Sequence, residues 1–232
     1  MITLYDNYQY NPDLKTGWGF SCLVKAGKEN ILFDTGADSP TLLANVKKLQ
    51  MDPKDIDMVV LSHAHGDHIG GLMGMLELNS DLTVFLPKSF SNDFKNRVAS
   101  HKAKVVEVAD PTTVHENAST TGQLGTFIKE QSLIVKTSRG LVVITGCAHP
   151  GIVKILKEAK KITGEDIYLV LGGFHLLNLT ASEVKELIKG FRDLEIKKVA
   201  PCHCSGDKTR EMFQEECGED FISNGVGKMI QF

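Results

Sequence analysis

Apolar and polar residues follow one another along this chain in blocks that predict strands and helices in a regular order. Two apolar runs within 20–34, joined by polar residues at 27–30, have the pattern of two strands with a tight connection. The short apolar run 57–62 is rich in β-branched residues, which is typical of a strand buried on both faces. Further strands are predicted at 81–87 and 104–109.

Helical periodicity appears between these strands. One helix is predicted to begin with Ser39 as its N-cap and Pro40 in its first position, and to continue to Leu49 with apolar residues on one face. Others are expected at 72–76 and within 90–100. The first half of the chain therefore runs from a β-rich start into alternating strands and helices.

The second half repeats this order. It begins with a predicted hairpin at 132–146 and a helix from Pro150. The remaining predicted elements are strands at 166–173, 197–203 and 228–232 and helices at 180–191 and 207–217, the former with a capping box from Thr180 to Glu183. Two such halves predict an α+β fold in which two sheets pack face to face with helices outside. We expect a single domain over residues 1–232.

Composition narrows the class of partner. The content of 42% hydrophobic and 24% charged residues is ordinary for a globular protein, and the net charge of −3 provides no basic field for nucleic acid or anionic membranes. No run approaches the roughly 18 apolar residues of a membrane span, and we see no secretory signal at the N-terminus. Five cysteines, an odd number, indicate reduced thiols. We therefore expect a cytoplasmic protein; its oligomeric state is left open.

The segment LSHAHGDHIGGL, residues 61–72, concentrates metal-binding side chains directly after a predicted strand. Residues two apart in an extended chain point the same way, so His63 and His65 can reach one metal together. Asp67 and His68 lie where the chain turns into a helix and would reach a second cation. Imidazole and carboxylate suit Zn, Fe, Mn or Ni. The alternative is a polar surface loop with chance histidines, which agrees poorly with four candidate ligand residues at this spacing.

Three further histidines each follow a predicted strand, which would bring them to the same sheet edge. They are His149, His175 and His203. The two remaining histidines, His101 and His115, lie in polar sequence and are expected outside the site.

Two other polar features are candidates for supporting roles. Asp34 ends a predicted strand, where it can orient a ligand imidazole or simply form a turn. Lys208 and Arg210 lie at the start of a predicted helix, where they could bind a substrate phosphate or carboxylate. Capping of that helix by Ser205 or Asp207 is the other interpretation of this segment.

Together these residues resemble a known family. HAHGDH resembles the H-x-H-x-D-H signature of the metallo-β-lactamase superfamily, and Asp34, the TGCAH segment and a late histidine follow in family order. TGCAHPGI, GGFHLL and PCHCSG resemble the branch labelled as dihydropterin ribofuranosyl-aminobenzene-phosphate synthases. The resemblance implies an αββα sandwich of two mixed β-sheets, with helices on the outer faces and a di-metal centre at one sheet edge.

The resemblance also assigns roles, with two departures. It implies that His63 and His65 bind the first metal, Asp67 and His68 the second, and that His203 is the last ligand of the superfamily. The superfamily's third histidine for the first metal is missing from GTFIKEQSLIV, and its TGD has become TGC. We therefore expect His149 to complete the first site. Cys147 replaces the bridging aspartate, either as a thiolate ligand or as a neutral packed thiol.

The narrower branch also has a histidine at position 175. We expect His175 to face the substrate, as a general acid or as a hydrogen-bond donor to an oxyanion, although it could instead cap a strand end. Cys202 and Cys204, which flank His203, are interpreted as plain strand-end cysteines rather than as a zinc knuckle.

These residues predict a metal-dependent hydrolase with one or two divalent transition-metal ions, Zn preferred and Fe, Mn or Ni also compatible. The metals would lower the pKa of bound water toward ~7, and the hydroxide, oriented by Asp67, would attack an ester, lactone, thioester or phosphoester. The expected partner is a small molecule, with a phosphorylated one as a candidate. Two alternatives stay open: a synthase that condenses a phosphorylated pterin with an aminobenzene ribofuranosyl phosphate, and a metal-holding binding protein with little turnover.

Overall fold

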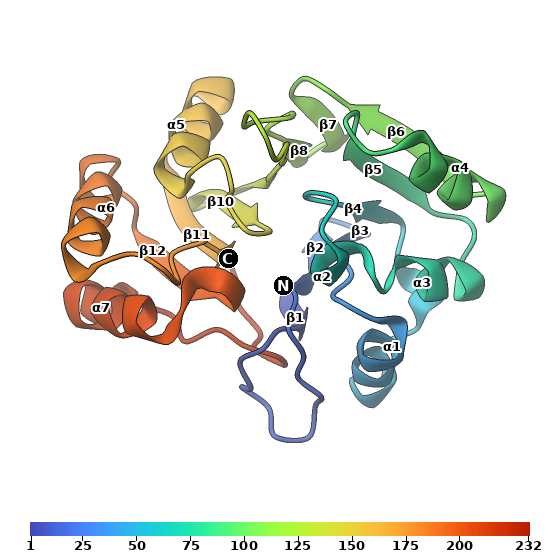
Figure 1. Cartoon of the computed structure of the whole chain (residues 1–232), viewed down its shortest axis with the longest axis horizontal. Coiled ribbons are helices and arrows are strands. Elements are labelled where there is room, and N and C mark those ends of the chain that lie inside the picture. Colours follow the sequence, from blue (N-terminus) through green and yellow to red (C-terminus); the bar gives the residue numbers. More distant parts are fainter.

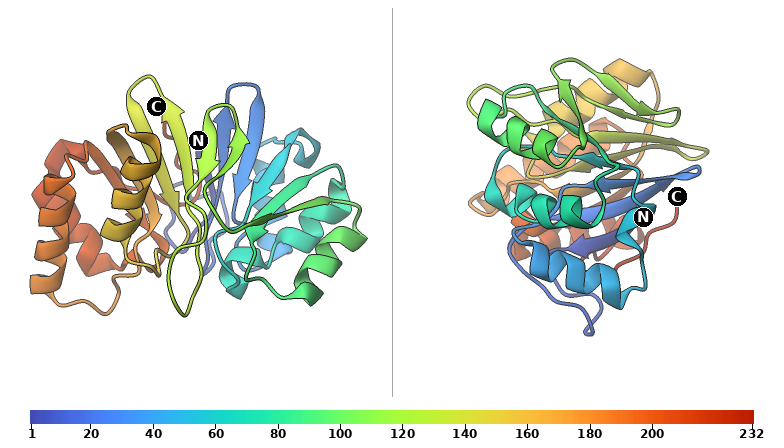
Figure 2. Two further views of the ribbon diagram at one scale, coloured as in Figure 1. Left: turned by 90° about the horizontal axis from the view of Figure 1, so that it is seen from above. Right: turned by 90° about the vertical axis from the view of Figure 1, so that its right-hand side faces the viewer.

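Two six-stranded sheets pack face to face in the computed structural model, which describes residues 1–232. Helices cover the outer face of each sheet, and the two halves of the chain form the two sides of the sandwich (Figures 1 and 2). This confirms the predicted αββα arrangement of two mixed sheets. That the chain is one domain stays a prediction.

The first sheet has the order β1-β2-β3-β4-β5-β6. Its first three strands are antiparallel, and β3 to β6 run parallel to one another. The strands are β1 Ile2–Tyr5, β2 Ser21–Ala26, β3 Glu29–Phe33, β4 Met58–Val60, β5 Thr83–Pro87 and β6 Lys104–Val108. The parallel part matches the alternation of strands and helices in the sequence, since parallel neighbours require a crossover connection.

The second sheet has the order β12-β11-β10-β9-β8-β7. Strands β7 to β10 are antiparallel, whereas β10, β11 and β12 are parallel. The strands are β7 Thr112–His115, β8 Ala118–Thr120, β9 Leu133–Thr137, β10 Gly140–Thr145, β11 Ile167–Gly173 and β12 Lys198–Cys202. The sequence analysis did not predict β1, β7 and β8.

Six helices connect the parallel strands, and a seventh follows β12. They are α1 Ser39–Lys48, α2 Gly66–Ile69, α3 Leu72–Leu78, α4 Asn92–Ser100, α5 Ile152–Thr163, α6 Ala181–Asp193 and α7 Asp207–Cys217. Short 3₁₀ turns lie at Pro53–Asp55, His203–Ser205 and Gly218–Asp220. The capping box predicted at the start of α6 is confirmed. None of these helices has the length and apolar character needed to cross a bilayer.

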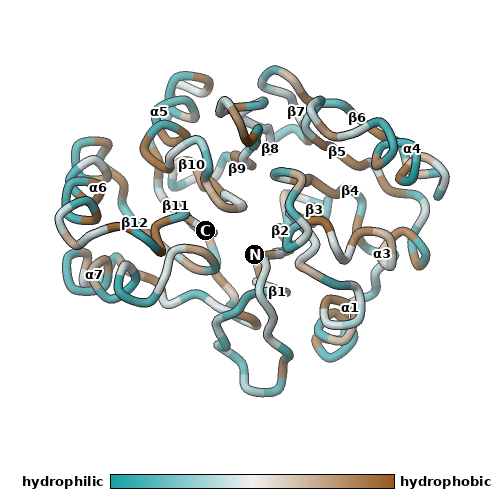
Figure 3. The backbone as a smooth tube through the Cα atoms, viewed as in Figure 1, coloured by the Kyte–Doolittle hydropathy of each residue, from teal (hydrophilic) through white to brown (hydrophobic).

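Apolar side chains fill three layers, one between the sheets and one between each sheet and its helices. Figure 3 shows the corresponding pattern along the backbone, with apolar segments on the strands and polar segments on the outer helices. Strands β4 and β10 contribute to both faces of their sheets, as Val59 and Val60 illustrate. This explains why their sequences are continuous apolar runs.

Two local predictions were wrong. The N-cap of α1 is Asp38, not Ser39, because the Asp38 carboxylate accepts a hydrogen bond from the Thr41 amide at 2.7 Å. Residues 228–232 form no regular strand, although they lie beside β1 and the Met1 amino group donates to the Ile230 carbonyl at 2.7 Å. The pairing with β1 is an isolated bridge between Ile2 and Met229.

The carboxyl ends of β3, β4, β10, β11 and β12 meet at one edge of the sandwich. Such an edge is the usual place for a site in sheets with parallel strands. The polar residues that follow these strands are therefore brought together by the topology.

Candidate metal centre

Three imidazoles converge at this edge from two loops. His63 and His65 follow β4, and His149 follows β10. His63 Nε2 lies 3.0 Å from His65 Nδ1, and His149 Nε2 lies 3.3 Å from the same atom. Ligands of a tetrahedral Zn²⁺ with bonds of about 2.0–2.1 Å stand roughly 3.3 Å apart. The structure thus brings the predicted third histidine to the first pair at a separation that suits one ion.

A second group lies beside the first. Asp67 and His68 belong to the short helix α2, and His203 follows β12. The Asp67 Oδ2 atom lies 3.7 Å from His68 Nε2 and 3.4 Å from His203 Nε2. These three side chains could hold another cation. Asp67 and His68 lie together, but His68 is not separate from the first group, because its ring lies 4.3 Å from that of His63.

Asp34 connects the two groups through hydrogen bonds. Its Oδ2 atom accepts from His68 Nδ1 at 2.7 Å and from the Ser62 hydroxyl at 2.7 Å, while Oδ1 accepts from the Ser62 amide. Because the Ser62 hydroxyl donates to Asp34, it must accept from His63 Nδ1, 2.9 Å away. Both imidazoles therefore carry their proton on Nδ1 and present the Nε2 lone pair to the site. Burial alone would lower the pKa of His68, but the Asp34 carboxylate outweighs burial and raises it.

Asn7 orients the third buried imidazole. His203 Nδ1 lies 3.1 Å from Asn7 Oδ1 and donates to it, which leaves Nε2 as the ligand atom. His203 Nε2 is buried and has no hydrogen-bond partner. A buried nitrogen lone pair without a partner is costly in an apolar site, and a metal ion would satisfy it. The sequence analysis missed Asn7, because the strand before it, β1, was not predicted.

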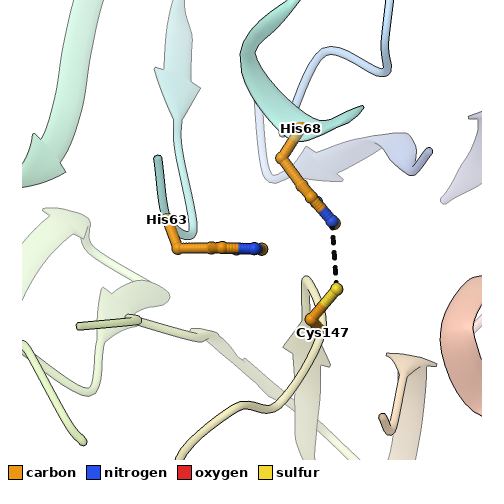
Figure 4. A group of neighbouring side chains, drawn as sticks. All are labelled: His63, His68 and Cys147. Carbon is orange, nitrogen blue, oxygen red and sulfur yellow. Dashed lines mark hydrogen bonds between the residues drawn. The ribbon is translucent and has the colours of Figure 1, made fainter. Parts of the chain in front are cut away.

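Cys147 lies between the two groups. Its Sγ atom is 3.2 Å from His68 Nε2. His63 lies close enough to both for the three side chains to hold a single ion together. Figure 4 shows the three side chains pointing toward one another from both halves of the sandwich. The thiol thus lies where the resemblance placed a bridging carboxylate. The hydrogen bond with Cys204 and burial both raise the pKa of the Cys147 thiol.

The remaining pKa values favour ligation. Burial and the neighbouring imidazoles hold the pKa of His63 far below its usual range and lower that of His149 to about 4. Burial opposes ionisation of Asp67, yet the neighbouring imidazoles of His203 and His68 outweigh it and lower the pKa of Asp67 to about 2. Neutral imidazoles and an ionised carboxylate are the protonation states in which these side chains bind metals.

Backbone strain is concentrated around these groups. Asp34, Ala148, His175 and His203 all have left-handed backbones, with φ of 54°, 61°, 56° and 48°. This conformation is uncommon for residues other than glycine and persists where the surrounding structure imposes it. A side chain at Gly146 would collide with Ser62 Oγ, so this glycine leaves room for the Asp34 network.

Glu130 is a functional candidate that the sequence analysis missed. Its carboxylate is buried, and it accepts three backbone hydrogen bonds, from Cys147 at 3.0 Å, Ala148 at 2.8 Å and His149 at 2.8 Å. Burial raises the pKa of Glu130 to about 7, and these amides act in the opposite direction. Glu130 lies in the stretch that lacks the superfamily's histidine, and it holds the loop that supplies His149 instead.

Replacing Glu130 with Gln should loosen this loop. The NH2 group of the Gln side chain would face a backbone N–H and cannot accept a hydrogen bond from it. We therefore expect a loss of about 1–3 kcal/mol in the free energy of unfolding and weaker zinc binding. Urea unfolding and chelator competition measure the two effects. Glu107→Gln, which disrupts only an exposed pair with Lys95, is the control. Unchanged zinc affinity in Glu130→Gln would show that the carboxylate does not position the loop.

A solvent-accessible cavity of about 380 Å³ opens onto the two groups. Trp18 and Leu177 line it, each about half exposed, together with His65, Asp67 and His149. His175 also lines the cavity, and its ring lies 4.4 Å from that of His149. That His175 faces the substrate stays a prediction.

Lys208 and Arg210 are not brought to the site. The Arg210 guanidinium lies 3.7 Å from the centre of the Tyr8 ring and donates to the carbonyls of Pro201 and Asn224. Neither basic residue lines the cavity. The N-cap of α7 is Gly206, without a side-chain hydrogen bond, so the alternative of capping by Ser205 or Asp207 was also wrong.

Comparison with known proteins gives concordant results. A family model described as the metallo-beta-lactamase superfamily matches residues 19–149. The chain is 32% identical to the 7,8-dihydropterin-6-methyl-4-(beta-D-ribofuranosyl)-aminobenzene-5'-phosphate synthase of Methanocaldococcus jannaschii, covering 100% of this chain and 96% of that protein. Its structure is similar to the crystal structure of Tm1679, a metal-dependent hydrolase of the beta-lactamase superfamily, with a TM-score of 0.83. The two sequences are 32% identical, and the match covers 100% of this chain and 98% of that chain.

A more distant structure shows the same fold. The metallo-beta-lactamase fold protein YhfI from Bacillus subtilis superimposes with a TM-score of 0.71 at 14% identity, covering 98% of this chain and 95% of that protein.

Proposed function

The chain belongs to the metallo-β-lactamase superfamily, and from that premise we propose that it is a metal-dependent hydrolase of a small ester, lactone, thioester or phosphoester. The observation that carries this proposal is the convergence of six ligand side chains, in two groups of three, on a cavity open to solvent. Similarity to a metal-dependent hydrolase over the whole chain supports it.

The donor sets suit two divalent transition-metal ions. His63, His65 and His149 would hold one, and Asp67, His68 and His203 the other, with Cys147 close to both. The Nδ1 protons held by Asp34, Ser62 and Asn7 leave Nε2 lone pairs directed into the site, and the buried, unpartnered Nε2 of His203 fits a metal-binding role. Imidazole and carboxylate favour Zn²⁺, with Mn²⁺, Fe²⁺ and Ni²⁺ compatible. Such ions, when bound, supply Lewis acidity that activates water and polarises the bond to be broken.

The chain's own residues divide the remaining work. Asp67 is partly exposed to the cavity, and its ionised carboxylate can accept a hydrogen bond from the attacking water and align it. His175 lines the cavity beside His149 and can donate a proton to the leaving group or a hydrogen bond to a developing oxyanion. Trp18 and Leu177 provide apolar surface that excludes water from the substrate.

Removal and return of metal test this proposal. Chelator-stripped protein should lose turnover of a panel of esters, lactones, thioesters and phosphodiesters, and Zn²⁺ or Mn²⁺ should restore it. The measurement is initial rate against added metal per chain. Turnover that persists in fully stripped protein would contradict a metal-dependent hydrolysis.

A second candidate is the synthase reaction, favoured by full-length similarity to the Methanocaldococcus jannaschii enzyme. The same centre would then activate a phosphorylated pterin for condensation with an aminobenzene ribofuranosyl phosphate. Incubation of the metal-loaded protein with both substrates, followed by mass spectrometry, distinguishes the two candidates. The joined product supports the synthase; its absence, together with hydrolysis in the panel, supports the hydrolase.

Trp18 should contribute to substrate binding. Stacking against an aromatic side chain contributes about 1 kcal/mol, so we expect Trp18→Ala to raise KM about fivefold with little change in unfolding free energy. Tyr10, which is 51% exposed like Trp18 but does not line the cavity, provides the matched control Tyr10→Ala. Equal KM values for the two variants would remove Trp18 from the substrate site.

A further inference from the structure

A sulfur-rich cluster lies against the two groups of ligands described above. Cys147 Sγ, Cys204 Sγ and a His175 ring nitrogen lie within 4.8 Å of one another. The three residues follow the neighbouring parallel strands β10, β11 and β12. Both thiols are almost fully buried and unpaired by disulfides, whereas the imidazole reaches the cavity.

The backbone holds the three side chains in place. The Phe174 amide donates to Ser205 Oγ at 3.1 Å, and the Leu176 amide donates to the Cys204 carbonyl at 3.1 Å. These bonds tie the loop on both sides of His175 to the turn that carries Cys204. A side chain at Gly173 would place its Cβ 2.7 Å from Cys204 Sγ, so the glycine leaves space for the sulfur.

The two sulfurs differ in their other contacts, and Cys147 Sγ also lies 3.2 Å from His68 Nε2. Cys204 Sγ makes a long hydrogen bond of 3.7 Å to the Cys147 carbonyl, which leaves its lone pairs free. Cys202, two residues earlier, differs: it faces Asn224, whose amide donates to its Sγ at 3.4 Å. The 3₁₀ turn His203–Ser205 separates the directions of the two cysteines.

We propose that Cys147, His175 and Cys204 form a third metal site, for a thiophilic divalent ion such as Zn²⁺. Two thiolates and one imidazole are a donor set that zinc prefers. Nitrogen and sulfur ligands of tetrahedral zinc stand roughly 3.3–3.8 Å apart, within the 4.8 Å limit of this cluster. Three protein ligands would leave a fourth position open, and all three residues line the cavity. The proposal goes beyond the proposed hydrolysis and does not require it, since an ion can bind here whether or not the protein turns over substrate. With this ion bound, His175 keeps one N–H for a hydrogen bond to a developing oxyanion but no longer serves as the proton donor.

Cobalt provides the test. Purified full-length protein is stripped of metal under reducing conditions and titrated with Co²⁺, while the thiolate-to-cobalt charge-transfer absorbance and the number of ions per chain are measured. We expect three ions per chain in the natural sequence. Cys204→Ser and His175→Ala should each bind one ion fewer, and Cys204→Ser should also lose part of the charge-transfer absorbance.

Cys202→Ser is the matched control, because it removes a buried thiol two residues away that is outside the cluster. It should retain the stoichiometry and absorbance of the natural sequence. His175 is exposed, so its variant remains informative if Cys204→Ser fails to fold. Identical stoichiometry in the natural protein and in His175→Ala would overturn the proposal. A disulfide between Cys147 and Cys204 that persists in reduced, metal-replete protein, detected by mass, would overturn it as well.

The readout also separates this proposal from the proposed function. Loss of one ion from Cys204→Ser with hydrolysis retained supports the third site alone. An inactive natural protein that still binds the third ion leaves the site intact and removes the hydrolase.

Discussion

The double variant His63→Ala/His65→Ala is expected to lose turnover by on the order of a thousand-fold. Lewis-acid stabilisation by a bound metal contributes several kcal/mol to catalysis, and each 1.4 kcal/mol or so corresponds to a factor of ten. Both imidazoles belong to one group of three, so only His149 would remain to hold that ion. We therefore also expect one metal ion fewer per chain, measured by elemental analysis alongside initial rates.

The chain supplies a matched control for this variant. His101 and His115 lie outside every group of candidate ligands, and His101 only bonds to the Arg97 carbonyl at 2.9 Å. His101→Ala/His115→Ala removes the same number of imidazoles and should retain both metal content and rate. Because His63 is fully buried, thermal unfolding of the metal-free proteins must show that the site variant is folded. Equal rates in the two double variants would contradict the proposed role of the loop.

Asp34→Asn is expected to weaken metal binding about 10–100-fold, the range found when partners behind metal ligands are altered. Asn tolerates the left-handed backbone of this position, at φ 54°, so the change tests chemistry rather than chain geometry. An amide in place of the carboxylate cannot accept all the hydrogen bonds from His68 and Ser62. A further loss of about 1–3 kcal/mol in unfolding free energy is expected, since buried donors lose their partner. Competition with a metal-sensitive dye measures the affinity.

Asp38→Ala controls for stability in this comparison. The Asp38 carboxylate caps α1 and accepts from the Tyr5 hydroxyl at 2.7 Å, but it belongs to no candidate metal group. Loss of a cap costs about 1 kcal/mol, so this variant should unfold more readily with unchanged metal affinity. If Asp34→Asn binds metal as tightly as Asp38→Ala, then Asp34 does not orient the ligands.

Much of the arrangement at this edge was predictable, because parallel strands bring residues that are distant in the chain to a common edge. His149 illustrates this: its position after a strand, in a chain without the superfamily's usual third histidine, was enough to predict a place next to His63 and His65. The structure brings these nitrogens within hydrogen-bonding distance. Apolar runs likewise predicted the buried parallel strands, since such strands are apolar on both faces.

Other residues left no readable pattern. Glu130 acts through backbone amides, which carry no sequence signature, and it precedes a strand rather than following one. Asn7 follows β1, a short strand whose four residues show too little periodicity to predict. Cys204 was interpreted as an ordinary strand-end cysteine because one C-x-C pair, without a second pair, is weak evidence for a zinc knuckle. The chain instead leaves the strand at Cys202 and turns, which directs Cys204 into the site.

The segment at the start of α7 shows a different limit. Two basic residues near a helix N-terminus predict an anion site only if their side chains are free. The Arg210 guanidinium is already engaged, because it donates hydrogen bonds to the carbonyls of Pro201 and Asn224 and packs over the ring of Tyr8. Such tertiary engagement cannot be deduced from local sequence.

The central claim is that His63, His65 and His149 hold one ion while Asp67, His68 and His203 hold another. A crystal structure of the zinc-loaded protein, with anomalous diffraction collected at the zinc edge, tests it most directly. We predict anomalous peaks within bonding distance of His63 Nε2, His65 Nδ1 and His149 Nε2 and of Asp67, His68 Nε2 and His203 Nε2. This claim would be contradicted by zinc-replete crystals in which one or both groups lack a peak. It would also be contradicted by crystals in which His149 is turned away from His63 and His65.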